Sequence, residues 1–102
     1  MRTFTTKKGD TRVCPGGTLL SPKGTPLNLV GATVRFIMKD KSTVLIDKEA
    51  VVLDAENGRV AYPWQPGETD TAGIYQGWFK VTYQDMKTET FPNSGSLLIV
   101  IG

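Results

Sequence analysis

Residues 70–83 of the chain read DTAGIYQGWFKVTY, and from Ile74 onward they alternate two sets of side chains. A period of two places successive side chains on opposite faces of an extended strand. One face carries Tyr75, Gly77, Phe79, Val81 and Tyr83. The opposite face carries Ile74, Gln76, Trp78, Lys80 and Thr82. The segment therefore predicts one long strand whose first face packs into a core and whose second, mixed face is turned outward.

The start of this strand carries the most specific local motif in the chain. Asp70 is followed by Gly73, and Tyr75 comes two residues later at the beginning of the strand. This spacing is typical of a tyrosine corner, in which the tyrosine hydroxyl bonds to upstream backbone and fastens an immunoglobulin-like sandwich. Antibody domains have a disulfide cysteine two residues after that tyrosine, whereas this chain has Gly77 there. We therefore expect structural roles for Asp70, Gly73 and Tyr75, without the disulfide.

The rest of the chain repeats the strand pattern at the intervals of a sandwich. Phe36 lies on the apolar face of the alternating run 32–39. Tyr62 and Trp64 share one face of the run 59–64, so all three side chains are expected in the core. Further strands are predicted at 43–47, 50–53, 88–91 and 97–101, and less clearly at 2–7 and 11–20, where Pro15-Gly16-Gly17 interrupts the pattern. About seven to nine strands with turns every 8–12 residues or so predict a single domain over 1–102, an all-β, immunoglobulin-like antiparallel β-sandwich.

Several turns and one unusual strand refine this prediction. Asn57-Gly58 favours a tight hairpin because both residues tolerate positive φ, and residues 92–95 break the chain before its last strand. The run 50–53 either continues the strand at 43–47 or restarts as a new one. Residues 97–101 read LLIVI and are apolar on both faces. Such a strand invites uncontrolled pairing at a sheet edge, so we expect it to be central or covered.

The residue types present exclude most catalytic and metal sites. The chain has no histidine and one cysteine, Cys14. Ser-His-Asp and Cys-His nucleophiles, histidine metal sites and structural zinc sites are thereby removed, and Gly16-Gly17 precedes no helix that could hold a phosphate. We therefore expect no catalytic, cofactor-binding or metal-binding residues, and a protein that is not an enzyme. No base neighbours Cys14, which favours a structural thiol over a reactive one.

The acidic residues offer two weak candidates for chemistry. Asp47 and Glu49 are two residues apart and share a strand face, as paired catalytic or calcium-binding carboxylates can. Lys48 stands between them, and a polar strand face is normally solvated, so a solvated charge cluster is the favoured interpretation. The loop at 54–57 lacks the spaced acids and the terminal glutamate of a calcium loop.

Charge and hydropathy argue against nucleic-acid and membrane roles. The 12 basic and 10 acidic residues give a net charge of +2, and they are scattered and form no basic stripe. No apolar run approaches the roughly 18 residues of a membrane span. Residues 1–6, MRTFTT, lack the apolar region of a signal peptide. We expect synthesis and folding in the cytoplasm, without contact to nucleic acid or membrane.

Trp78 is the residue of the outward face with the clearest functional potential. It either lies at the edge of the core under a loop, or it is exposed as a binding patch. With Gln76 and Lys80 it forms a candidate interface, an aromatic anchor among polar neighbours. A carbohydrate-binding module with Trp78 and Trp64 as stacking platforms is an alternative, which the core-facing position of Trp64 weakens.

Five segments carry a family resemblance through their order and spacing. They are 9–11 (GDT), 27–36 (LNLVGATVRF), 57–64 (NGRVAYPW), 71–75 (TAGIY) and 90–92 (TFP). Together they resemble an N-terminal domain of phage baseplate upper proteins, over nearly the whole chain. The resemblance implies an immunoglobulin-like structural component of a bacteriophage tail or baseplate, made in the bacterial cytoplasm and located in the virion. It further implies docking onto other virion structural proteins or further copies of the chain, with no catalytic or cofactor residues to transfer.

Two departures from the family leave alternatives open. Baseplate upper proteins usually continue past this domain, whereas this sequence reaches Gly102 directly after its last predicted strand. A one-domain virion protein and a fragment of a longer protein both fit. Residues 84–87 read QDMK where the family would have Asp-Gly, which alters a turn and not the fold. A capsid-surface or head-to-tail accessory protein of the same fold is the second structural candidate.

Overall fold

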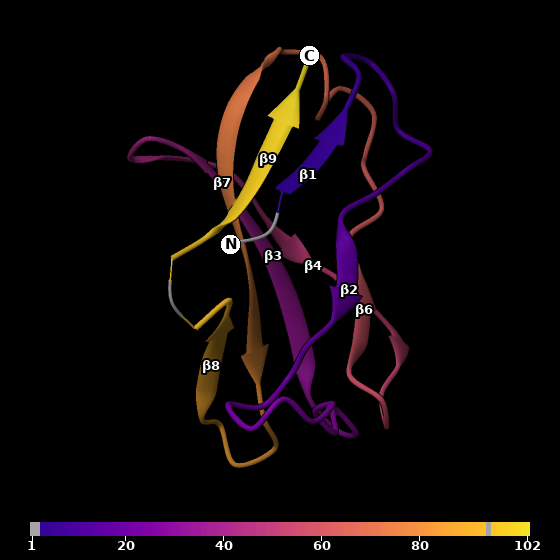
Figure 1. Ribbon diagram of the computed structural model, residues 1–102, viewed down its shortest axis with the longest axis vertical. Coiled ribbons are helices and arrows are strands. Elements are labelled where there is room, and N and C mark those ends of the chain that lie inside the picture. Colours follow the sequence, from indigo (N-terminus) through magenta and orange to yellow (C-terminus); the bar gives the residue numbers. More distant parts are fainter. Residues whose placement is uncertain (1–2, 94) are drawn as a thin grey trace.

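A computed structural model describes residues 3–93 and 95–102 and arranges them as two β-sheets that enclose a common core (Figure 1). Arg2, in one predicted strand, and Ser94, in the predicted break at 92–95, lie outside the described residues. The all-β sandwich is confirmed, since the described residues form strands and no helix, and so none that could cross a membrane. The strands are β1 (Thr3–Thr6), β2 (Gly16–Thr18), β3 (Thr33–Asp40), β4 (Thr43–Glu49), β5 (Val51–Asp54), β6 (Arg59–Ala61), β7 (Gly73–Thr82), β8 (Thr88–Phe91) and β9 (Leu97–Ile101).

The larger sheet is organised around β7, the long alternating strand. Its order is β1-β9-β7-β3-β4, and β8 also pairs with β7. β9 pairs with residues 73–77 of β7 and β8 with residues 79–82, so the two share one edge of the long strand. β9, the strand that is apolar on both faces, lies between β1 and β7, which confirms the prediction that it is not left at an edge.

The smaller sheet has the order β2-β6-β5 and is antiparallel. Its β5–β6 hairpin turns at Asn57-Gly58, with Gly58 at a φ of 67°. The chain changes sheets at the buried Ala50, whose N–H donates to the carbonyl of Val34 at 2.8 Å. Residues 50–53 therefore restart as a new strand and do not continue β4.

Two features of the N-terminal third differ from the expectation. β1 runs parallel to β9, from Thr3 opposite Leu98 onward, because a period-two pattern carries no information about strand direction. Gly16-Gly17, expected to interrupt a strand, belongs to β2 itself. A Cβ at Gly16 would lie 2.5 Å from the carbonyl oxygen of Val60, so only glycine lets β2 approach β6 this closely.

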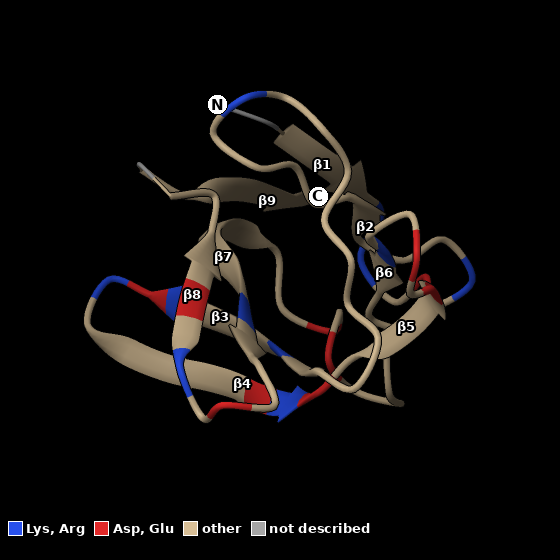
Figure 2. Cartoon of the chain, turned by 90° about the horizontal axis from the view of Figure 1, so that it is seen from below, with Lys and Arg blue, Asp and Glu red and all other residues tan. Residues whose placement is uncertain are grey.

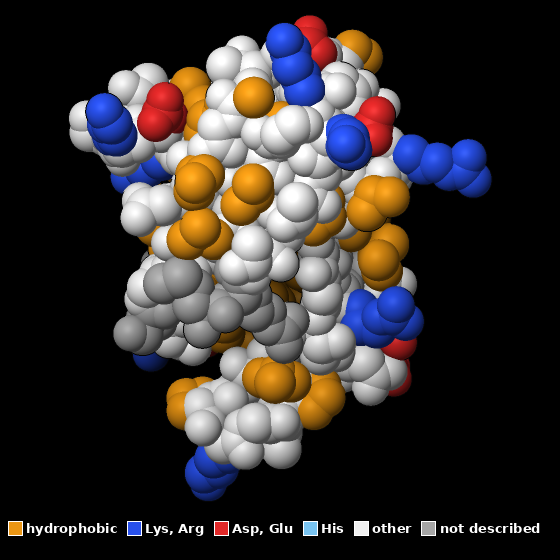
Figure 3. Space-filling model, turned by 45° about the horizontal axis from the view of Figure 1, so that its top comes forward, with side chains coloured by type: hydrophobic (Ala, Val, Ile, Leu, Met, Phe, Trp, Pro, Cys, Tyr) orange, Lys and Arg blue, Asp and Glu red, His pale blue; other side chains and the backbone are white. Residues whose placement is uncertain are grey.

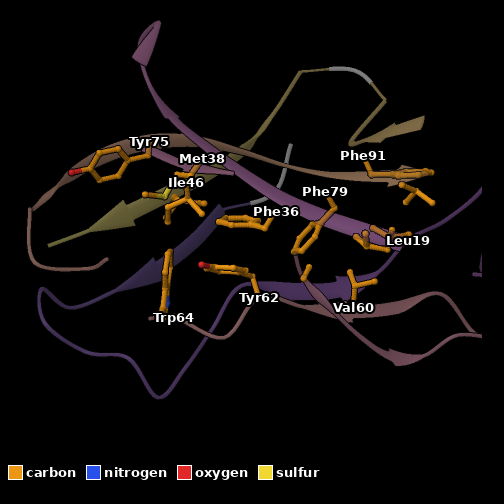
Figure 4. Packing of buried hydrophobic residues seen from close by; sticks show 14 of the residues in the cluster. Leu19, Phe36, Met38, Ile46, Val60, Tyr62, Trp64, Tyr75, Phe79 and Phe91 are labelled. Carbon is orange, nitrogen blue, oxygen red and sulfur yellow. The ribbon is translucent and has the colours of Figure 1, made fainter. Parts of the chain in front are cut away.

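Aromatic side chains fill the centre of the core (Figure 4). The fully buried Phe36 stacks on Tyr62 with ring centroids 4.8 Å apart and meets Trp64 edge-on at 6.1 Å. Phe79 of β7 packs against it at 5.2 Å. Burial of each such side chain contributes about 1.5–3 kcal/mol, and each well-oriented aromatic pair adds about 0.5–1.5 kcal/mol. Phe36, Tyr62 and Trp64 thus occupy the core positions that the alternation predicts.

Candidate docking surface

The tyrosine corner forms at the start of β7. The hydroxyl of Tyr75 donates to the carbonyl of Thr71 at 2.8 Å, the upstream bond that the motif predicts. Gly73 leaves room for the ring, because a Cβ there would lie 3.0 Å from the Tyr75 hydroxyl. Asp70 is exposed, and its carboxylate makes no hydrogen bond within the described part of the chain. Its part in the loop is through its backbone N–H, which donates to Gly67.

Glu68 anchors the loop before the corner, a role that the sequence pattern does not reveal. Its side chain is only 11% exposed. The carboxylate accepts hydrogen bonds from the Tyr62 hydroxyl at 2.9 Å and the Gln65 N–H at 2.7 Å, and pairs with Lys48 at 3.0 Å. Burial, and to a smaller extent the hydrogen bond to Glu68, raises the pKa of Tyr62 above its ordinary value. Tyr62 and Gln65 lie within six residues of Glu68 in the sequence, whereas Lys48 comes from β4, so this ion pair forms only in the folded chain.

Trp78 lies on the outer side of the larger sheet and is half-buried. Its indole N–H donates to the carbonyl of Gly95 at 2.9 Å, in the connection between β8 and β9. The ammonium of Lys39 lies 5.7 Å from the ring centroid, within cation–π range. Trp78 is absent from the core cluster, so the structure combines both interpretations: one edge is held under a connection and the rest stays accessible.

Strand register surrounds Trp78 with side chains that the sequence pattern could not assign as its neighbours. Ile37 of β3 lies directly opposite it, and Lys39 lies opposite Gln76. Leu98 of β9 lies on the other side of Gln76. We call the outward side chains of β3, β7 and β9 the outer face; besides Trp78 they include Ile37, Lys39, Ile74, Gln76, Lys80, Leu98 and Val100.

The cations of the outer face are only partly neutralised. Arg35 turns toward β4, where its Nε lies 2.8 Å from a carboxylate oxygen of Asp47. Lys80 lies opposite Arg35 in the register, so that two like charges are adjacent. Within residues 3–93 and 95–102, neither Lys80 nor Lys39 has a salt-bridge partner. Among the described residues, basic and acidic residues are interspersed over the strands and loops, without a basic stripe (Figure 2).

Asp47, Asp54 and Cys14 make local structural contacts. Asp47 is engaged by Arg35, and Asp54 accepts a hydrogen bond from Asn57 at 2.9 Å. No group of three His, Cys, Asp or Glu side chains that could hold a metal ion occurs in the described residues. Cys14 is half-buried against the core.

Other apolar side chains reach the surface in separate places. Val51 and Leu53 of β5 are exposed on the smaller sheet, and Val13 and Val30 are exposed in loops. One face of the molecule shows hydrophobic side chains in small groups that are separated by polar atoms (Figure 3). The outer face differs from these groups because a large aromatic side chain lies at its centre, on the longest strand.

The comparisons with known proteins agree with the β-sandwich fold. The family model of the BppU N-terminal domain, the N-terminal domain of the baseplate upper protein, matches residues 19–93. Among solved structures, the N-terminal domain of phage TP901-1 ORF48 superposes with a TM-score of 0.66 at 16% sequence identity, covering 95% of this chain and 81% of that one. No curated protein matches the chain in sequence. The family gives the chain a structural role in a phage tail or baseplate, in association with other virion proteins. The chain belongs to the family of BppU N-terminal domains.

Proposed function

We propose that the chain is a docking domain whose outer face, centred on Trp78, binds a neighbouring structural protein of the tail or baseplate. The observation that carries this proposal is the half-buried indole on a central strand, flanked by two lysines for which the described part of the chain offers no salt-bridge partner. Binding energy in protein interfaces concentrates in a few central residues, among which tryptophan is enriched.

The chemistry of the outer face defines the partner surface. An apolar side chain would cover Trp78 and Ile37, and carboxylates would meet Lys39 and Lys80. Such charges steer encounter and set register more than they add affinity. Gln76, which lies between Lys39 and Leu98 in the register, supplies a polar group, as expected for a mixed interface.

The fold holds this surface in place before binding. β7 pairs with β3 along residues 76–82, its other edge pairs with β9 at 73–77 and with β8 at 79–82, and the indole N–H is already bonded to Gly95. A side chain that is fixed in advance loses less conformational entropy when a partner covers it.

Sugar binding has less support than protein docking. Trp64 is buried in the core, so it offers no stacking platform. The ring of Trp78 has the Lys39 ammonium over it, which a sugar would have to displace.

The test is binding of purified variants to the tail and baseplate proteins of the same phage. Trp78→Ala should weaken binding by at least about 2 kcal/mol, roughly 30-fold, and Lys80→Glu should slow association at low salt. Leu53→Ala, an exposed aliphatic residue of the smaller sheet, and Lys87→Glu, an exposed lysine after β7, are matched controls and should bind normally.

Thermal melts establish that each variant is folded. Unchanged binding by folded Trp78→Ala would contradict the proposal. Self-association through Trp78 would contradict it as well, because the partner would then be a second copy.

A further inference from the structure

We infer that the groove between β2 and the β8–β9 connection is a second binding site, which takes an extended, uncharged segment of another virion protein as an added strand. The site is separate from the outer face. The inference rests on the proposed docking function only in taking the partner to be another virion protein.

The groove opens at the side of the sandwich where the smaller sheet ends. Its volume is about 330 Å³, at the lower end of the range for ligand pockets. No charged residue is among the described residues that line it. Leu19, Phe79 and Phe91 gather at this end of the core (Figure 4). Its apolar side chains come from Leu19, Leu20, Phe79, Phe91, Pro92 and Leu97.

One wall of the groove is the free edge of β2. Among the residues that the structure describes, this strand pairs only with β6, in a register that sets Gly17 opposite Val60. On one side of this pair, the Leu19 N–H donates to the carbonyl of Gly58 at 2.8 Å. On the other side, the Tyr62 N–H donates to the carbonyl of Pro15 at 2.9 Å, so every second residue of this segment bonds toward β6. The backbone groups of Gly17 therefore face β6, and those of Gly16 and Thr18 face the groove. Within the described residues, the structure records no hydrogen-bond partner for these outward groups.

The unpaired edge of β2 and the apolar lining of the groove together favour one kind of occupant. Unpaired N–H and C=O groups at strand spacing are satisfied by the backbone of an extended peptide, the recognition mode known as β-strand addition. Alternate side chains of that peptide would enter the apolar groove. A charged side chain would lose its hydration there without gaining a counter-charge, so charge complementarity favours an uncharged segment.

The probe is a short capped peptide in which leucine alternates with threonine, titrated into the isotope-labelled chain by NMR. The amide resonances of Gly16 and Thr18 should shift, and their hydrogen exchange should slow. The same peptide with methylated backbone nitrogens keeps its apolar side chains but cannot donate to β2. It should bind at least about tenfold more weakly if strand addition is correct.

A pair of protein variants tests the location. Leu20, 38% exposed, lines the groove, whereas Val30, 59% exposed, lies outside it. Leu20→Lys should weaken binding of the leucine–threonine peptide by at least about tenfold, and Val30→Lys should leave its binding unchanged. Lys80→Glu, which alters the outer face but keeps the Trp78–Gly95 hydrogen bond beside the groove, should also leave peptide binding unchanged, so the failure of one site can be told from the failure of the other.

Three results would overturn the inference. They are no shift of the Gly16 and Thr18 amide resonances at millimolar peptide, equal binding of the methylated peptide, and a change in the groove resonances when the chain alone, without peptide, is diluted. The last result would show that the groove is filled by a second copy.

Discussion

Replacing Tyr75 with phenylalanine removes one hydroxyl and keeps the buried ring. The lost bond is the 2.8 Å contact to the carbonyl of Thr71. A neutral intramolecular hydrogen bond contributes about 0.5–1.5 kcal/mol net, and a stranded buried partner adds to that cost. Thr71 is exposed, so water can replace the hydroxyl at its carbonyl. We therefore expect Tyr75→Phe to lower the free energy of unfolding by about 1 kcal/mol.

Urea melts with parallel thermal melts measure this change. The urea midpoint should fall by about 0.3–1 M with an unchanged m-value, and the Tm should fall by about 4–8 °C. Asp70→Asn is a suitable control, since the exposed carboxylate makes no hydrogen bond in the described chain. It should change stability by less than about 0.5 kcal/mol.

A double-mutant cycle with Gly73 ties the effect to the corner. A Cβ at Gly73 would lie 3.0 Å from the hydroxyl of Tyr75, the nearest atom that it meets. Gly73→Ala should therefore cost less in the Tyr75→Phe background than alone, with a coupling of at least about 0.5 kcal/mol. An unchanged midpoint for Tyr75→Phe, together with an additive cycle, would refute the reasoning.

Three further predictions follow from the hydrogen bonds and backbone angles. Glu68→Gln should lower the free energy of unfolding by about 1–3 kcal/mol, because a nearly buried acceptor loses its charge. Lys48→Met should lower it by less than about 1 kcal/mol, since the lysine is 55% exposed, and equal losses in denaturant melts would contradict this. Met86 has a φ of 68° and is exposed, so Met86→Gly should stabilise the chain by about 0.5–1 kcal/mol, and a lower melting midpoint would count against it. Burial, followed by the hydrogen bond to Glu89, raises the pKa of Tyr83 from 10.0 to about 12. The unfolded chain then loses this proton first, so stability should be retained below about pH 10 and fall between pH 10 and 12, less steeply in Tyr83→Phe; identical alkaline melts for the two proteins would exclude the effect.

Local patterns predict much of this fold because they reflect physics within one strand. Alternation correctly assigns the buried faces of β3 and β7, and the spacing of Gly73 and Tyr75 predicts the corner bond. These features depend on residues close in sequence. The parallel pairing of β1 and the change of sheet at Ala50 depend on the whole chain, and no local pattern encodes them.

The candidate surface is predictable only along β7. Alternation places Gln76, Trp78 and Lys80 together on one side of that strand. Ile37 and Leu98 become their neighbours through strand register, which single-strand periodicity does not determine. The same limit applies to the pairing of Glu68 with Lys48, which lies 20 residues away in the sequence.

Hydroxyl-radical footprinting of the assembled tail or baseplate tests the central claim most directly, because it reads the exposure of individual side chains. Trp78 on the outer face and Met86 at the tip of the β7–β8 turn, 78% exposed, can be followed in the same sample. If the outer face docks, oxidation of Trp78 should fall severalfold on assembly while oxidation of Met86 stays as in the free chain. Unchanged oxidation of Trp78 in the assembled particle would contradict the account.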